Sequence, residues 1–95
     1  MIISFKCKKT GHLYNGGRVP AFSGFARQAD KRLRILDASD TLEALKALPS
    51  NRFGALSGDR KGQYSIAVNQ QWRVCFTWDD GAHDVEIVDY HLVMT

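Results

Sequence analysis

The sequence predicts an α+β fold, in which helices precede a twisted antiparallel β-sheet and pack on one of its faces. Apolar residues recur with a helical period over residues 20–37, whereas a period of two dominates from residue 52 onward. Turn sequences divide that second part into short strands. Because 95 residues can bury one modest core, we expect a single domain over residues 1–95.

The chain begins with a strand-like alternation. Residues 2–6 place Ile3 and Phe5 on one side, and we expect them to join the sheet as an edge strand or a neighbour of later strands. Residues 7–15 are ambiguous and are compatible with a short helical turn that ends at Gly16 and Gly17.

Two helices are predicted next. The first spans residues 20–37, where one apolar stripe consists of Phe22, Phe25, Ala26, Ala29, Leu33 and Leu36. The second begins at Asp40, which we expect to cap the helix, with Glu43 placed as a capping-box partner. Pro49 ends this helix, whose expected buried face consists of Leu42, Leu45 and Leu48.

Four strand segments follow. The first begins at Phe53 and ends near Ser57, and the others span residues 64–68, 72–78 and 85–90. In the third segment Trp72, Val74, Phe76 and Trp78 alternate with Arg73, Cys75 and Thr77, so the two sets face opposite ways. We expect both tryptophans to belong to the core.

Charge is unevenly distributed along the chain. Residues 1–58 carry ten Lys or Arg and four Asp or Glu, a balance of +6, whereas residues 59–95 carry three and six, a balance of −3. A basic half is typical of proteins that bind RNA, but composition alone favours a solvated helix face.

No apolar run is long enough to span a membrane, and the N-terminus lacks the apolar region of a signal peptide, so we expect a cytoplasmic protein with no membrane partner. Cys7 and Cys75 lack metal-ligand spacing, and we expect neither a metal nor another cofactor.

Arg73 is the first candidate site residue. An arginine in mid-strand is costly to bury unless it is paired, so it could form a salt bridge with Glu86 or Asp89. Alternatively its planar guanidinium could hold a phosphate through parallel donors.

The chain then places an acid, a phenol and an imidazole together at the end of the last strand, as Asp89, Tyr90 and His91. Cleavage of RNA by its 2′-hydroxyl needs a base, an acid and positive charge at the phosphorane. His91 could transfer protons, Arg73 could supply the charge, and Tyr90 could donate a proton or stack on a base. Asp89 could fix the imidazole tautomer.

Arg60 and Lys61 lie in a basic turn between two strands. Composition favours a plain hairpin turn, although in a nuclease these residues would contact RNA phosphates.

Several segments together identify a resemblance: the opening IISFK, the LDA turn, LSGDRKGQYSIAVNQQWRVCF and the closing VEIVDYH. The chain resembles the HigB-type toxins of the RelE/ParE superfamily over nearly its whole length. The resemblance implies a RelE/ParE-like fold and a ribosome-dependent, metal-free mRNA endoribonuclease. It also implies that Arg73 contacts phosphate and that Asp89, Tyr90 and His91 form the catalytic cluster. The expected partners are a helix-turn-helix antitoxin of the HigA type, in a heterotetramer, and the 70S ribosome with mRNA.

The chain departs from this family at two places. Many members read His-Pro-Leu-Lys-Gly-Asp where this chain has residues 54–59, so Gly54 and Ser57 replace a His and a Lys. The chain also continues past His91 through residues 92–95, where many members stop. These departures leave two alternatives open: a non-cleaving inhibitor of gyrase or the ribosome, and an attenuated toxin that mainly binds its antitoxin.

Overall fold

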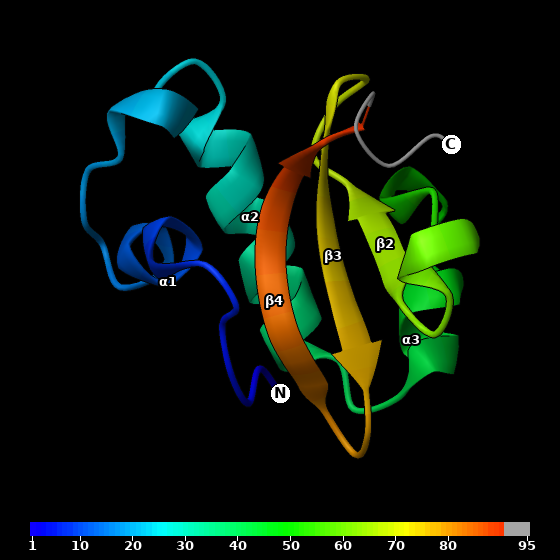
Figure 1. Cartoon of the computed structure of the whole chain (residues 1–95). Coiled ribbons are helices and arrows are strands. Elements are labelled where there is room, and N and C mark those ends of the chain that lie inside the picture. Colours follow the sequence, from blue (N-terminus) through cyan, green and yellow to red (C-terminus); the bar gives the residue numbers. More distant parts are fainter. Residues whose placement is uncertain (91–95) are drawn as a thin grey trace.

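The computed structural model describes residues 1–90 and contains a four-stranded antiparallel sheet (Figure 1). Its strands lie in the order β1-β2-β3-β4. Their bounds are Gly54–Ala55 for β1, Tyr64–Ala67 for β2, Trp72–Trp78 for β3 and Ala82–Asp89 for β4. The predicted α+β class and the antiparallel order are confirmed.

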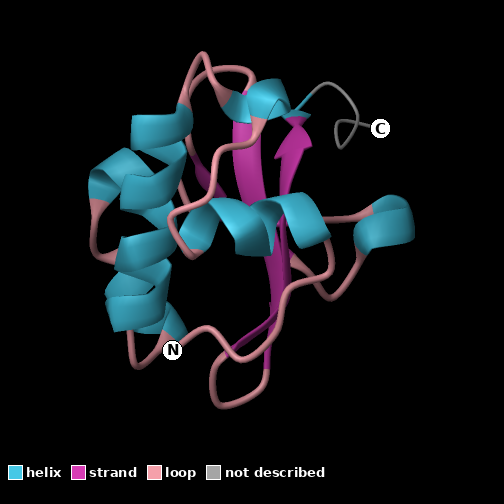
Figure 2. Cartoon of the chain, turned by 90° about the vertical axis from the view of Figure 1, so that its left-hand side faces the viewer, coloured by secondary structure: helices cyan, strands magenta, loops and turns pink. Residues whose placement is uncertain are grey.

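Within residues 1–90 three α-helices accompany the sheet: α1 over Lys8–Tyr14, α2 over Ala26–Ala38 and α3 over Leu42–Lys46. Short 3-10 helices occupy Pro20–Phe22 (η1), Pro49–Asn51 (η2) and Gly58–Arg60 (η3). Helix α2 packs on β3 and β4, and α1 packs against α2 and β4. Figure 2 shows α2 on one side of the sheet and η3 on the opposite side. We call the side away from α2 the open face.

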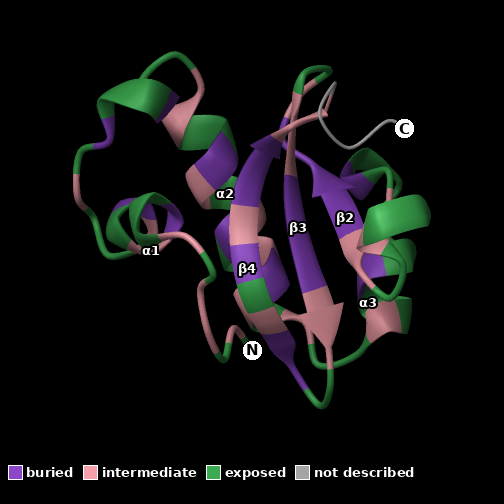
Figure 3. Cartoon of the chain, in the orientation of Figure 1, coloured by how far each residue is buried: buried purple, intermediate pink, exposed green. Residues whose placement is uncertain are grey.

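The core lies between α2 and the sheet (Figure 3). Ala29, Leu33 and Leu36 are fully buried, which confirms the predicted stripe. The sheet contributes residues from alternate strand positions: Ile66, Val74, Phe76, Val85 and Ile87. Both tryptophans pack against this core, as predicted.

The first long helix begins later than the sequence predicts. Residues 20–22 form η1, and α2 starts only at Ala26. A turn over residues 23–25 separates η1 from α2, and Gly24 within that turn disfavours a continuous helix. Phe25 stacks on Trp72 of β3 at 4.7 Å between centroids, and Phe22 meets the same indole edge-on at 6.1 Å.

The second helix differs in its cap and its buried face. Thr41, and not Asp40, is the N-cap, because its Oγ1 accepts a hydrogen bond from the Ala44 backbone N–H at 3.1 Å. Leu45 is buried, but Leu48 is 38% exposed, since the helix ends at Lys46 before Leu48 can face the core.

The N-terminal segment lies beside β4, although it forms only isolated bridges. Ile2 pairs with Ala82 and Phe5 with Val85, both in the parallel sense. The prediction that residues 2–6 lie next to a later strand is therefore confirmed. The prediction that they form a continuous strand is wrong. The ambiguous segment that follows forms α1. Within residues 1–90 no helix is long and apolar enough to cross a membrane.

Candidate active site on the open face of the sheet

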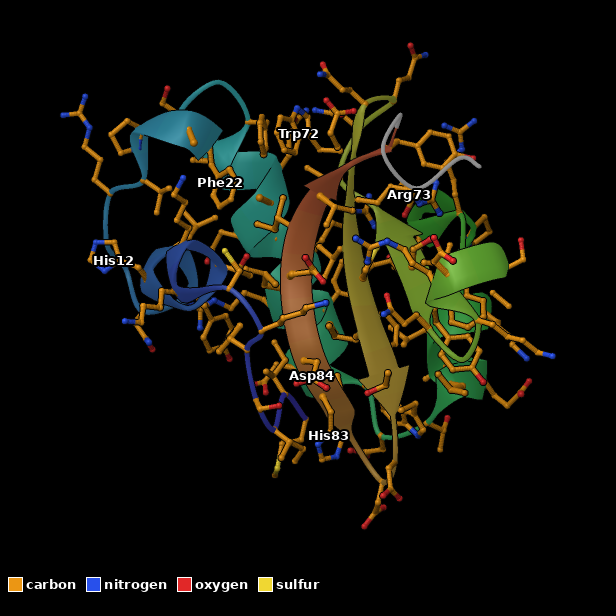
Figure 4. The ribbon with its side chains drawn as sticks, viewed as in Figure 1. His12, Phe22, Trp72, Arg73, His83 and Asp84 are labelled. Atoms are coloured by element: carbon orange, nitrogen blue, oxygen red, sulfur yellow. The ribbon has the colours of Figure 1, made fainter. Side chains whose placement is uncertain are left out.

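The strand register determines which side chains share the open face. Directly paired residues point the same way, and the register pairs Ser65 with Cys75, Arg73 with Val88, and Cys75 with Glu86. Trp72 faces the opposite side (Figure 4), where it contacts Phe22 beside α2. A single strand, β3, thus supplies the core with one set of residues and the open face with the other.

Arg73 is held in one orientation by three contacts. Its Nε donates to Ser65 Oγ at 2.8 Å, and its Nη2 donates to the Arg52 carbonyl oxygen at 2.5 Å. Arg52 adopts a left-handed conformation with φ of 47°, directly after η2. The Arg73 Cζ atom also lies 5.0 Å from the centroid of the Tyr90 ring, a cation–π contact.

Burial lowers the pKa of Arg73, and the nearby Tyr90 opposes that effect. An arginine starts so far above neutrality that its guanidinium stays charged. Glu86, one of the two acids considered as its salt-bridge partner, instead pairs with Lys6 and Arg60. Within residues 1–90, the contacts made by Arg73 are therefore mainly to neutral oxygens and an aromatic ring, which leave its positive charge available to a ligand.

The end of β4 delivers Tyr90 and Asp89 to different places. The Tyr90 backbone N–H donates to the Gln71 carbonyl oxygen, and its ring lies against Arg73. Asp89 pairs with Trp72 in the register, on the face opposite to Arg73, and its Oδ2 accepts from Gln71 Nε2 at 3.0 Å. His91 lies outside the described residues.

Two polar residues that the sequence analysis did not single out support this end of the site. Asn69 Oδ1 accepts hydrogen bonds from the backbone N–H groups of Gln71 and Trp72, both at 2.8 Å. These bonds close the turn between β2 and β3, where the Gln71 carbonyl oxygen accepts the hydrogen bond from the Tyr90 backbone N–H. Ser65 is buried with its hydroxyl on Arg73. The signal that could have found it was the alternation in residues 64–68, which puts Ser65 on the face opposite to Tyr64 and Ile66.

The basic turn lies on the open face at a second position. Arg60 Nη1 is 3.5 Å from Glu86 Oε2 and donates to Gln63 Oε1 at 3.0 Å, whereas Lys61 is exposed. Gly54 has open space where a Cβ atom would project. Among residues 1–90, no group of three or more His, Cys, Asp and Glu side chains could hold a metal ion.

A fixed arginine, an adjacent phenol and a basic turn on the open face form a surface suited to a polyanion. Residues 4–91 match a family of RelE-like toxins of type II toxin–antitoxin systems. The family is HigB, and this chain belongs to it. A toxin of such a system has an antitoxin as its partner.

Two curated relatives agree with this assignment. "Toxin HigB-1" of Vibrio cholerae is 43% identical over 61 residues, which cover 64% of this chain and 64% of that protein. "Endoribonuclease HigB" of Proteus vulgaris is 33% identical over 94 residues, which cover 96% of this chain and all of that protein. The match thus spans under two thirds of the Vibrio relative but the full length of the Proteus relative.

Proposed function

We propose that this protein is an endoribonuclease toxin that cuts mRNA on the 70S ribosome in the cytoplasm, without a metal or other cofactor. Its membership of the HigB family supports the toxin activity, and its full-length similarity to a protein named endoribonuclease supports the reaction class. The observation that carries the proposal is the fixed guanidinium of Arg73 beside the Tyr90 ring on the open face.

Arg73 suits the stabilisation of a phosphorane. A guanidinium has five N–H donors, and within residues 1–90 the hydrogen bonds to Ser65 and Arg52 use two of them, which leaves three for a phosphate. Those donors are held in place before the substrate arrives, so little reorganisation is needed as negative charge develops.

Tyr90, His91 and Asp89 complete the proposed mechanism. His91 is the leading acid or base for the 2′-hydroxyl and the 5′ leaving oxygen, since an imidazole titrates near neutrality. Tyr90, already against Arg73, can donate a proton or stack on a base. Asp89 orients the end of β4 through its hydrogen bond with Gln71 and can fix the tautomer of His91.

The proposed partners follow from this function. The ribosome would align the mRNA with the site, which supplies a large part of the barrier reduction, so cleavage of RNA free in solution should be slow. Arg60 and Lys61 would contact the phosphates of the strand. The antitoxin would be a HigA-type helix-turn-helix protein, assembled with the toxin as a heterotetramer.

The test is to express the wild-type protein, Arg73→Ala and His91→Ala without antitoxin and to map new 5′ ends on cellular mRNA. We expect new ends within translated frames for the wild-type protein, and loss of both the ends and growth inhibition in each variant. Full toxicity of both variants would contradict the assigned site.

A non-cleaving inhibitor is the second candidate, and the specific observation in its favour is the absence of His and Lys at Gly54 and Ser57. Such a protein would arrest growth by occupying a surface of gyrase or of the ribosome. Growth arrest with intact mRNA would favour this candidate, and loss of DNA supercoiling would identify gyrase as the target.

A further inference from the structure

A second group of charges lies on the open face, centred on Glu86 of β4. Glu86 Oε2 is 3.4 Å from Lys6 Nζ and 3.5 Å from Arg60 Nη1. The Glu86 side chain is 15% exposed and that of Lys6 is 57% exposed. One nearly buried carboxylate therefore holds two cations that lie far apart in the sequence.

Both cations are also positioned by contacts independent of Glu86. The Lys6 backbone N–H donates to the Val85 carbonyl oxygen at 3.0 Å, which aligns the N-terminal segment with β4. Arg60 ends η3, and its Nη1 donates to Gln63 Oε1 at 3.0 Å. The segment and the turn thus meet over the same part of the sheet.

This group adjoins Arg73. Glu86 pairs with Cys75 in the register, and Cys75 lies two residues from Arg73 along β3, roughly 7 Å away. The charges of Lys6, Arg60, Arg73 and Glu86 all act on the buried Cys75 thiol: burial raises its pKa to about 11, the three cations lower it and Glu86 raises it. The four charged groups consequently surround one point of the sheet, with three positive charges against one negative charge.

We propose that Lys6 and Arg60, held by Glu86, form a second phosphate-binding position for single-stranded RNA beside Arg73. This inference rests on the proposed function and extends it to a path for the RNA strand across the open face. Lys6 and Arg60 each have donors beyond those bound to Glu86, and these can reach a phosphate from the solvent side. Glu86 is a positioning residue, since it acts through the two cations.

The test measures binding, so it does not depend on cleavage. The dissociation constant of a 2′-O-methyl RNA oligonucleotide is measured from about 50 mM to about 200 mM salt for wild-type protein, Lys6→Gln and Arg60→Gln. The logarithm of the association constant falls as the logarithm of the salt concentration rises. Each lost phosphate contact should make this slope shallower by about 0.7. Lys31→Gln is the matched control, because Lys31 is exposed on α2 and its loss changes the net charge equally.

The role of Glu86 is tested in the same assay by a double-mutant cycle. In the Glu86→Gln background, removing Lys6 or Arg60 should change the slope by much less than in the wild-type background, because the cations are no longer held at one place. Melting temperatures of all variants check that they fold, and Glu86→Asp provides a second test if Glu86→Gln does not fold.

Three results would overturn the proposal. The first is an equal change of slope in Lys6→Gln and Lys31→Gln, and the second is a change of slope on removing Lys6 or Arg60 that is the same with and without Glu86→Gln. The third is that the wild-type protein does not bind the oligonucleotide at low salt. Failure of the proposed nuclease would look different, since the slopes would change as expected while cellular mRNA stayed intact.

Discussion

The two faces of the sheet are built from alternate residues of the same strands, but they differ in what their side chains contact. On the covered face, Val74 and Phe76 are buried against other apolar groups. On the open face, Arg73 and Glu86 contact hydroxyl, carbonyl and charged groups that distant segments supply. The covered face thus stabilises the fold through burial, whereas the open face uses the fold to hold polar groups in place. A substitution should accordingly affect stability on one face and activity on the other.

The largest effect is expected on the covered face. Phe76→Ala removes a fully buried ring and should lower the free energy of unfolding by about 3–5 kcal/mol. The neighbouring Thr77 lies on the open face and is only half-buried, so Thr77→Ala should cost less than about 1 kcal/mol. Urea denaturation of both variants measures this difference, and equal costs would break the distinction between the faces.

Arg73→Lys tests the open face while keeping the positive charge. We expect at least about a hundredfold loss of mRNA cleavage, because a lysine cannot hold Ser65 and Arg52 while also presenting a planar set of donors. Arg27→Lys, an exposed change on α2, is the control and should leave cleavage unchanged. If Arg73→Lys cleaved mRNA as fast as the wild-type protein, only the positive charge at this position would matter.

A gain of activity would sharpen the comparison further. Gly54 has open space for a side chain, so Gly54→His together with Ser57→Lys should fit and should raise cleavage at least about tenfold. Gly24→His with Ser23→Lys is the matched control, since Gly24 also has open space but precedes α2. Unchanged cleavage in both double variants would mean that Gly54 and Ser57 do not attenuate this protein.

The smallest effect concerns Cys75, which faces the site but is buried like a core residue. Its pKa is raised from 9.0 to about 11 by burial, so the unfolded thiol ionises at lower pH than the folded one. Below pH 9 the thiol is protonated in both states, and its contribution to the free energy of unfolding is fully present. Between pH 9 and about 11 the unfolded thiol ionises first, so the free energy of unfolding falls, by about 1 kcal/mol at pH 10. Cys75→Ala should remove this part of the pH dependence in denaturation curves, and an identical dependence would contradict the burial effect.

Local periodicity was enough to predict most of the fold. The alternation in residues 72–78 assigned Trp72 to the core side and Arg73 to the other side, and the structure confirms both. The helical stripe assigned Ala29, Leu33 and Leu36 correctly. Helix ends were less predictable: Thr41 caps α3 in place of Asp40, and α2 starts only after the turn over residues 23–25, which contains Gly24.

The candidate site residues were chosen by residue type, and their roles in cleavage stay a prediction, whereas their contacts were less predictable. Arg73 and Tyr90 do meet, but Ser65 and the Arg52 carbonyl, which fix Arg73, come from segments whose distance depends on strand pairing. The sequence order of Asp89 and Tyr90 suggested one cluster, whereas strand alternation and the turn at Gln71 give them different neighbours.

By itself, the sequence determined the fold class, the alternation that separates core from open face, and membership of a toxin family, because these depend on local periodicity and on residue identity. The tertiary structure alone decided the register of β3 and β4, the parallel contacts of the N-terminal segment with β4, and the meeting of Lys6 and Arg60 at Glu86. Those features require segments up to eighty residues apart to pack together, as in the contact between Lys6 and Glu86, and no local pattern specifies which segments will meet.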